Sequence, residues 1–416
     1  MLHDAVYDVV VVGGGPSGAT AAHDLVRRGW NVMLLDRAGR IKPCGGAIPP
    51  RLVKDFDIPD EMIVARISGA QIVSPKDRRV MMPIDGGYVG MVDRETFDEW
   101  LRKRAQSAGA DLRHGRFETF TRDKDGTAVI GYRPQGAPED APNAHVRARA
   151  VIGADGANSS VAREAVPNAG QPKYVFAYHE IVRAPSEDAA SDAIRAPDYD
   201  GRRCDVYYRG DLSPDFYAWI FPHGETMSVG TGSAHKGFSL KGSVADLRRL
   251  TGLDSYETIR REGAPIPLKP LKRWDNGRDV LLAGDAAGVV APASGEGIYY
   301  AMLGGRLSAD AVEQFLATGD ARALAGARKR FMKDHGRVFW VLGIMQHFWY
   351  RNDKRRERFV DMCADPDVQR LTWQSYMHKE LVKRDWWAHV RVFIKDTAHL
   401  LGLVSEAGAK RNEKPG

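Results

Sequence analysis

The sequence predicts an α/β protein with a Rossmann-like domain, an antiparallel β-sheet domain and a C-terminal helical region. Three observations support this prediction. An apolar strand at residues 9–12 runs into a glycine-rich turn and a helix, which is how a doubly wound α/β domain begins. Residues 165–265 contain apolar runs with turn residues between them, at the spacing of an antiparallel sheet. The stretch after residue 320 has helical periodicity and many aromatic side chains.

The length and charge of the chain limit its organisation and its partners. Its 416 residues are too many for one simple core and enough for two or three domains. The net charge of +6 suits an acidic cofactor or anionic lipid headgroups and is too dispersed to indicate nucleic acid. Cys44, Cys204 and Cys363 are too scattered to predict a disulfide framework or a metal site. We therefore expect a reducing compartment, the cytoplasm.

The hydrophobic runs argue against export and against membrane spanning. The first run lacks a basic leader and ends in the glycine turn, so it is not a signal peptide. No run approaches the ~20 apolar residues that a membrane-spanning helix needs. We expect peripheral membrane contact at most.

A dinucleotide-binding fingerprint lies between the first strand and the first helix. Gly13, Gly15 and Gly18 have the spacing G-x-G-x-x-G. The first glycine permits the tight turn, the second lets a pyrophosphate approach the backbone, and the third lets the helix pack on the strand. Asp36 ends the next apolar strand, where a carboxylate can bind a ribose diol; the alternative is another kind of α/β turn with an acidic residue there by chance. The residues that we expect to contact the dinucleotide here are Gly13, Gly15, Pro16, Ser17, Gly18, Asp36 and Arg37.

Two later strands also end at an acidic residue. Asp155 follows one, and Gly284-Asp285 follows the other. The first could be an ordinary strand-to-helix junction, but beside the fingerprint it indicates a second wall of the nucleotide site. An ordinary junction is a poor explanation of the second, because small residues continue for so long after it. Asp285 can accept a hydrogen bond from a ribityl hydroxyl. The turn at residues 295–297 leads into a helix expected at 299–316, whose N-terminus favours negative charge on a flavin ring.

A loop and an arginine complete the predicted cofactor site. Residues 43–50 hold prolines and glycines around Cys44, which excludes a helix interior or a central strand. Loops at this edge of a doubly wound sheet usually face the ligand, and a plain connection with a spare thiol is the alternative. Arg94 starts a helix, where the helix dipole disfavours a cation. We interpret it as a cation for a cofactor phosphate, against the alternative of a solvated surface arginine.

Aromatic side chains mark two further segments. Tyr217, Trp219 and Phe221 alternate along one strand, so they share a face and form a wide apolar wall. From this pattern alone, an ordinary packed core is the favoured explanation. Residues 337–350 are apolar on most sides of a helix, which is therefore buried, lines an apolar cavity or contacts lipid. Trp386-Trp387 lie among basic residues, as at a membrane interface; a helical subdomain with a solvated basic face explains them equally well.

Three separated segments resemble the nucleotide-binding segments of one superfamily. Residues 13–36, 153–163 and 284–298 are similar to those of FAD-dependent oxidoreductases of the para-hydroxybenzoate hydroxylase type. The chain departs from the superfamily at one point. The usual Asp-Gly motif ends in an arginine one position before Arg163, where this chain has Ala162. This departure puts a role of Arg163 in nicotinamide binding in question.

Two more specific motifs resemble one family within that group. The sequence Pro-Cys-Gly-Gly-Ala-Ile-Pro at 43–49 is one, and Tyr-x-Trp-x-Phe-Pro at 217–222, followed by Gly-x-Gly at 230–232, is the other. Both are similar to motifs of the geranylgeranyl reductase family. Residues 356–363 and 375–377 are similar to the (bacterio)chlorophyll-type reductases of phototrophs.

The resemblance implies a cofactor, a reaction and a domain arrangement. It implies noncovalently bound FAD, recharged by NADPH, and saturation of three isolated C=C bonds in a geranylgeranyl group to give phytyl. The group would be carried by a prenylated tetrapyrrole, as in (bacterio)chlorophyll biosynthesis, or by a diphosphate. The implied domains are an FAD-binding domain (1–65, 93–164 and 270–320), an antiparallel-sheet substrate domain (66–92 and 165–269) and a C-terminal helical region (321–416).

The resemblance also implies residue roles. Asp36 would bind the adenosine ribose, Arg94 and the glycine turn the pyrophosphate, and Asp285 the ribityl chain. Reduction of an isolated alkene needs a dry, aromatic-walled pocket and a proton donor within hydrogen-bond reach; we name Cys44, Tyr217 and a bound water as candidates. The remaining predicted cofactor-binding residues are Cys44, Gly45, Gly46, Ala47, Asp155, Gly284, Gly295, Gly297 and Ile298. The predicted substrate-binding residues are Tyr217, Trp219, Phe221, Pro222, Gly230 and Gly232.

Two other functions remain open. A flavin-dependent monooxygenase or halogenase would share the fold and the reduced flavin but would pass its electrons to O₂. A flavoprotein scaffold or prenyl-lipid carrier would bind without catalysis. In each case we expect a cytoplasmic protein, with peripheral contact to a photosynthetic membrane as an option.

Overall fold

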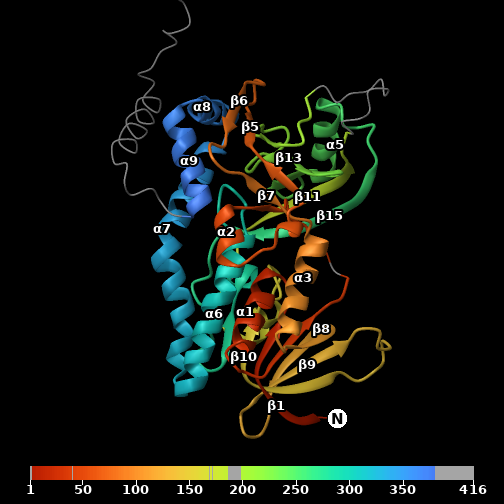
Figure 1. Ribbon diagram of the computed structural model, residues 1–416, viewed down its shortest axis with the longest axis vertical. Helices are drawn as coiled ribbons and strands as arrows, with labels where there is room; N and C mark the ends of the chain where they lie inside the picture. The colour runs from red at the N-terminus through yellow and green to blue at the C-terminus, as the bar shows by residue number, and fades with distance from the viewer. Residues whose placement is uncertain (1, 40, 168, 171, 186–197, 380–416) are drawn as a thin grey trace, which may run out of the picture.

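We describe residues 2–39, 41–167, 169–170, 172–185 and 198–379 of a computed structural model. Two large β-sheets lie one above the other along the long axis of the molecule (Figure 1). Long helices from the C-terminal part of the chain run beside both sheets. Trp386 and Trp387 lie outside the described residues.

The first sheet provides the edge on which the site is built. Its strand order is β1 (Leu2–Val12), β2 (Val32–Asp36), β8 (Asp111–Arg122), β9 (Ala128–Pro134), β10 (Ala144–Gly153) and β16 (Val280–Leu282), and β1 also pairs with β10. The pairs β1–β2, β2–β8, β1–β10 and β10–β16 are parallel, whereas β9 pairs antiparallel with β8 and β10. The apolar runs of β1, β2 and β16 are buried, as in a parallel sheet covered by helices.

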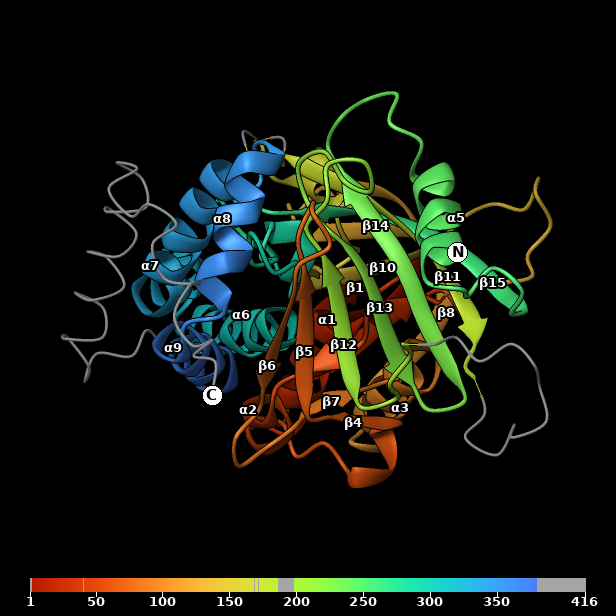
Figure 2. The ribbon, with the colours of Figure 1, turned by 90° about the horizontal axis from the view of Figure 1, so that it is seen from above.

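The second sheet is antiparallel with one exception. Its order is β15 (Thr258–Pro267), β11 (Tyr174–Arg183), β14 (Thr226–Ser233), β13 (Ala218–His223), β12 (Arg203–Tyr207), β5 (Gly69–Val73) and β6 (Arg79–Pro83), and Figure 2 shows several of these strands side by side. Only β12 and β5 pair in parallel. They lie far apart in sequence, so no hairpin dictates their relative direction. A small third sheet joins β3 (Ala47–Ile48), β7 (Val89–Met91) and β4 (Ala65–Ile67). The domain boundaries given above stay a prediction.

Helices cover both sheets. The α-helices of the described residues are α1 (Pro16–Val26), α2 (Pro50–Asp55), α3 (Arg94–Ser107), α4 (Ser160–Ala165), α5 (Leu240–Leu250), α6 (Ile298–Thr318), α7 (Ala325–Trp349), α8 (Asp353–Cys363) and α9 (Pro366–His378), and the short 3₁₀ turns are η1 (Asp60–Met62), η2 (Gly284–Ala287) and η3 (Ala321–Leu324). Helix α1 packs between α3 and α6, and α5 covers β11 and β14 of the second sheet. In this part of the chain, no helix combines the length and the apolar character that crossing a membrane requires.

The aromatic strand β13 faces the C-terminal helices. Tyr217 and Trp219 belong to a buried cluster with Trp349 and Tyr350 at the end of α7 and Val360 of α8. The helices therefore cover much of the aromatic face. The packed-core explanation accounts for this part of the predicted wall.

Candidate active site

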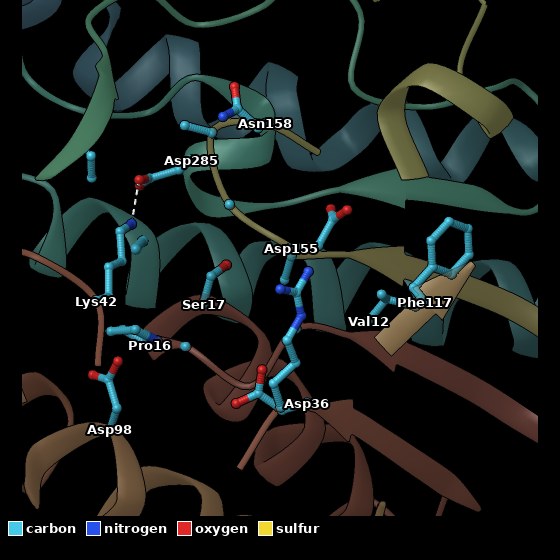
Figure 3. A pocket seen from close by; sticks show the side chains of 18 of the residues that line it. Val12, Pro16, Ser17, Asp36, Lys42, Asp98, Phe117, Asp155, Asn158 and Asp285 are labelled. Carbon is cyan, nitrogen blue, oxygen red and sulfur yellow. Dashed lines mark hydrogen bonds and ion pairs between the residues drawn. The ribbon is translucent and has the colours of Figure 1, made fainter. Parts of the chain in front are cut away.

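Four parallel strands of the first sheet end together, and predicted cofactor residues follow each of them. Val12 is in register with Leu35 and Gly153, and Gly153 is in register with Leu282. This register brings the residues after β1, β2, β10 and β16 to one edge, where they line a cavity of about 390 Å³ (Figure 3). The predicted residues that line this cavity are Gly13, Gly15, Pro16, Ser17, Asp36, Arg37, Asp155 and Asp285.

The three fingerprint glycines have different surroundings. A Cβ on Gly13 would lie 2.3 Å from the carbonyl oxygen of Ala154, and the φ of Gly13 is 102°. A Cβ on Gly18 would lie 1.8 Å from the carbonyl oxygen of Gly13, so only glycine lets α1 approach the turn. A Cβ on Gly15 would meet no atom within 4 Å. The turn therefore needs Gly13 and Gly18 for its own geometry, whereas Gly15 leaves space beside the backbone.

The start of α1 fits the diphosphate of FAD. Gly15 is the N-cap, and no side chain caps the helix. The first N–H groups of α1 therefore stay available at the positive end of the helix dipole. The buried Ser17 hydroxyl lines the cavity and has no hydrogen-bond partner among the described residues. These donors, with the space at Gly15, suit an anion that lies against the turn.

Asp36 has a partner that the sequence analysis missed. Nη1 of Arg102 in α3 lies 3.1 Å from an Asp36 carboxylate oxygen, and Arg102 also pairs with Glu99. Burial raises the pKa of Asp36, whereas the backbone N–H of Gly14 and the Arg102 cation act in the opposite direction. Arg102 holds the carboxylate at the strand end where an adenosine ribose is predicted.

Arg94 is buried, which excludes the surface-arginine alternative. Its guanidinium donates two hydrogen bonds, of 2.8 and 2.7 Å, to the carboxylate of Asp98 one turn later. Asp98 lines the large cavity, while Arg94 lines a smaller cavity of about 50 Å³ together with Lys42 and Cys44. Seen from the large cavity, Arg94 therefore lies on the far side of Asp98, next to the loop that holds Cys44. Its predicted contact with the pyrophosphate stays a prediction.

The other two acidic residues also have protein partners. Asp155 accepts hydrogen bonds from the Ser159 hydroxyl at 2.5 Å and from the backbone N–H of Ser160 at 2.6 Å, next to the start of α4. Burial raises its pKa, and these donors oppose that effect. Asp285 forms an ion pair with Lys42, which lines both cavities (Figure 3).

The glycines of the loop at 43–49 bring Cys44 close to the second sheet. A Cβ on Gly45 would lie 2.9 Å from the Phe221 ring, and one on Gly46 would lie 2.6 Å from Nε2 of His223. Cys44 is half-buried, and its sulfur accepts a hydrogen bond from the Gly46 N–H at 3.4 Å. The loop can lie on β13 only because these positions lack side chains.

The three aromatic rings of the second sheet lie on one face, as the alternation predicted. Ring centroids of Tyr217 and Trp219 are 5.9 Å apart, and those of Trp219 and Phe221 are 6.0 Å apart. A Cβ on Gly230 would lie 2.3 Å from the Trp219 ring. The glycine pair of β14 therefore makes room for rings, since Gly232 is similarly close to Phe216.

The Tyr217 hydroxyl is already engaged. It donates a 2.6 Å hydrogen bond to the carbonyl oxygen of Ser294, which ties β13 to the loop before α6. Burial raises the pKa of Tyr217 well above its ordinary value. Both observations make its proton harder to transfer than that of an exposed tyrosine.

The remaining predicted residues line neither of these two cavities. Several pack directly behind cavity residues: a Cβ on Gly284 would lie 2.7 Å from Ser17 Cβ. Arg163 is exposed and donates to the Asn158 carbonyl and the Ser160 hydroxyl, so it folds back on its own turn. The predicted residues outside both cavities are Gly18, Gly45, Gly46, Ala47, Tyr217, Trp219, Phe221, Pro222, Gly230, Gly232, Gly284, Gly295, Gly297 and Ile298.

Comparison with known proteins identifies the family. A model described as "FAD binding domain" matches residues 61–303, and one described as "FAD dependent oxidoreductase" matches residues 8–47. The chain is 55% identical over 398 residues to a geranylgeranyl diphosphate reductase of Rhodobacter capsulatus, covering 96% of this chain and 98% of the relative. The chain belongs to the geranylgeranyl reductase family. It is an FAD-dependent oxidoreductase.

Other relatives support the same family assignment. A chloroplastic geranylgeranyl diphosphate reductase of Oryza sativa is 37% identical over 422 residues, covering 97% of this chain and 88% of the relative. The crystal structure of a geranylgeranyl bacteriochlorophyll reductase-like protein from Thermoplasma acidophilum has a TM-score of 0.79 at 21% identity, over 97% of this chain and 100% of that one. The structural likeness confirms the predicted fold, and the sequence relatives confirm the predicted family.

Proposed function

We propose that this reductase uses NADPH to saturate the three isolated C=C bonds of a geranylgeranyl group carried by a diphosphate or by a tetrapyrrole. The main support is that the loop that holds Cys44 contacts both the predicted cofactor region and the aromatic strand. Cys44 lines the small cavity beside the cofactor cavity, and the aromatic face of β13 lies against the same loop. The relatives named above as geranylgeranyl diphosphate reductases support the diphosphate as a substrate.

FAD, when bound and reduced by NADPH, would supply the hydride, and the residues of this chain would bind and orient the alkene and supply the proton. The open face of Gly15 and the start of α1 would hold the diphosphate of the cofactor, with Asp36 and Arg102 at the ribose. The rings of Tyr217, Trp219 and Phe221 would exclude water and stabilise positive charge on the alkene carbon during reduction.

We propose Cys44 as the proton donor in preference to Tyr217. Cys44 is half-buried and lines the small cavity, whereas the Tyr217 proton is directed at the Ser294 carbonyl. The Arg94 guanidinium lines the same small cavity and would stabilise the Cys44 thiolate that remains after proton transfer. We expect Cys44→Ala to lower turnover by about 10²-fold or more with FAD still bound. Turnover at the wild-type rate in this variant would exclude Cys44.

We propose that NADPH binds only transiently to reduce the flavin, and that the protein has no separate dinucleotide-binding domain for it among the described residues. The sequence has one glycine fingerprint in the context of a strand and a helix, and the described cofactor cavity is built on it. The test is anaerobic mixing of the purified protein with NADPH or NADH, followed at the flavin absorbance. Bleaching by NADPH supports the proposal, and flavin that neither nucleotide bleaches contradicts it.

The substrate is tested by anaerobic incubation with NADPH and either geranylgeranyl diphosphate or a geranylgeranylated tetrapyrrole, followed by mass analysis. We expect products heavier by successive additions of two hydrogens. A requirement for O₂, or an oxygenated product, would instead favour the monooxygenase alternative.

We also propose that the protein lies in the cytoplasm and contacts a membrane peripherally through α7. Trp340 and Ile344 lie one turn apart on this helix and are 68% and 48% exposed. Exposed aromatic and aliphatic side chains on one helix face suit the headgroup boundary of a bilayer.

The Trp340→Gln/Ile344→Gln double variant should lose flotation with phosphatidylglycerol vesicles. Phe176→Gln, which removes another exposed aromatic ring, should not. Flotation unchanged in the double variant would contradict the proposal.

A further inference from the structure

A buried ion pair joins the end of α9 to the loop before α6. Nζ of Lys379 contacts Oε2 of Glu296, and the two side chains are 2% and 6% exposed. Glu296 lies in the turn at residues 295–297, which is predicted to approach the flavin ring together with the N-terminus of the next helix. The other carboxylate oxygen of Glu296, Oε1, is buried and has no hydrogen-bond partner among the described residues.

Among the described residues, the surroundings of this pair are aromatic, with a single further charged group nearby. Lys379 Nζ lies 3.8 Å from the ring centroid of Tyr376 and 5.8 Å from those of Tyr299 and Tyr300. That group, within the part of the chain that the structure describes, is Arg51 of α2, which donates to the carbonyl of His378 at the end of α9. The buried His335 of α7 lies one layer further away, against Tyr299 and Tyr300.

The backbone at Lys379 is fitted to this contact. Lys379 is the C-cap of α9, and its φ of 56° lies in the left-handed region that favours glycine. A lysine there carries a conformational cost that a glycine would avoid. A buried ion pair is in general a weak source of stability, because desolvation offsets the attraction. Stability alone explains neither the strained backbone nor the buried pair, and both lie next to the predicted cofactor site.

The location of Glu296 supplies that consequence. It comes immediately before Gly297, the N-cap of α6, and interacts with the backbone N–H of Tyr299 in the first turn. An unpaired carboxylate there would cancel the positive end of the α6 dipole, which otherwise favours negative charge at the flavin. Lys379 neutralises that carboxylate.

We propose that Lys379, through its ion pair with Glu296, is a positioning residue that keeps the N-terminus of α6 electrostatically positive toward the flavin and so raises the flavin's reduction potential. The inference rests on the proposed function and on the prediction that the flavin ring lies at the turn of residues 295–297 and the start of α6. It assigns the last described helix a role at the cofactor site. Lys379 and Glu296 are 83 residues apart in sequence.

The test is the reduction potential of bound FAD in single and double variants, measured between pH 5.5 and 9 without NADPH or alkene. In Lys379→Met, Glu296 is left alone and is charged at the higher pH values. The potential should therefore fall below wild type as pH rises. In Glu296→Gln, Lys379 is left alone and is charged at the lower pH values, so the potential should rise above wild type as pH falls. We expect offsets equivalent to about a tenfold change in the equilibrium between oxidised and reduced flavin, which is about 30 mV for a two-electron couple.

Three further variants make the test specific. Lys379→Arg and the double variant Lys379→Met/Glu296→Gln should both stay near the wild-type potential at every pH, because each keeps the net charge of the pair. Arg370→Met removes a cation of α9 that pairs with Asp367 at the surface, and should change nothing. FAD affinity, measured in parallel, reports any loss of folding.

The inference is overturned if both single variants shift the potential in the same direction, or if neither shifts it while FAD stays bound. Because no substrate is present, failure here is distinct from failure of the proposed reductase activity, which the mass analysis above tests. Should Lys379→Met not bind FAD, the Glu296→Gln and double variants still show in which direction the charge of the pair shifts the reduction potential.

Discussion

Substitutions at Gly15 and Gly18 allow an effect on FAD binding to be distinguished from an effect on the stability of the fold. A methyl group on Gly15 would meet no protein atom within 4 Å, and its φ of −72° is accessible to alanine. A methyl group on Gly18 would lie 1.8 Å from the Gly13 carbonyl oxygen, which cannot yield without moving the turn. The two substitutions add the same atom three residues apart, so they form a matched pair.

We expect Gly15→Ala to keep its fold and lose FAD. Alanine is a poorer N-cap than glycine, so the flavin-free protein should lose at most about 1 kcal/mol of unfolding free energy. The methyl group occupies the space that a diphosphate needs against the turn, so FAD affinity should fall at least tenfold, which is about 1.4 kcal/mol. Gly18→Ala should instead destabilise the flavin-free protein by about 1–3 kcal/mol through overpacking.

Two measurements on each variant decide the matter: thermal unfolding of the flavin-free protein, and FAD titration followed by flavin fluorescence. Wild-type FAD affinity in Gly15→Ala would refute the assignment of this turn to the diphosphate. Equal destabilisation of the two flavin-free variants would refute the distinction drawn between the two glycines.

Three further predictions follow from single contacts. Replacing Arg102 by Met leaves the half-buried Asp36 carboxylate without its cation, so FAD affinity should fall several-fold, and Arg102→Lys should recover part of it in the same titration. Tyr217→Phe removes the hydrogen bond to Ser294 and should cost about 1 kcal/mol in thermal unfolding while turnover persists; lost turnover with flavin bound would reinstate Tyr217 as proton donor. Burial lowers the pKa of His223 from 6.5 to about 4, so the folded state binds fewer protons than the unfolded state between these values. Stability should therefore decline by on the order of 2 kcal/mol as pH falls from 6.5 to 4, and denaturant titrations of His223→Gln should show a flatter profile.

The parts of the site that are local in sequence could be predicted from it. The spacing of Gly13, Gly15 and Gly18 between a strand and a helix specifies a turn, and Asp36 at the next strand end follows from the same unit. The alternation of Tyr217 and Trp219 likewise fixes which rings share a face. Each of these conclusions depends on only a few consecutive residues.

The parts that depend on long-range pairing could not be predicted. Lys42 meets Asp285 across 243 residues, and Arg102 meets Asp36 across 66 residues. A signal for Arg102 existed in part. With Arg94 and Asp98 it forms a polar row at four-residue spacing, directly beside the apolar stripe of α3. Such a row indicates a buried polar face, although it does not name the partner.

The same limit applies to the second sheet and its surroundings. The parallel pair β12–β5 was missed, because no turn connects the two strands. The predicted role of the Gly-x-Gly pattern at 230–232 in substrate binding stays a prediction; the structure adds a packing role, because a Cβ at Gly230 would collide with Trp219. A close approach between strand neighbours is visible only when the strands are paired.

In the proposed reaction, electrons held by the reduced flavin pass to an isolated alkene. The decisive experiment reduces the protein with NADPH without oxygen, removes excess nucleotide, and adds geranylgeranyl diphosphate while the flavin absorbance is recorded. We expect the yellow absorbance to return on addition of the prenyl substrate alone. Absorbance that returns only when O₂ is admitted would rule out this transfer.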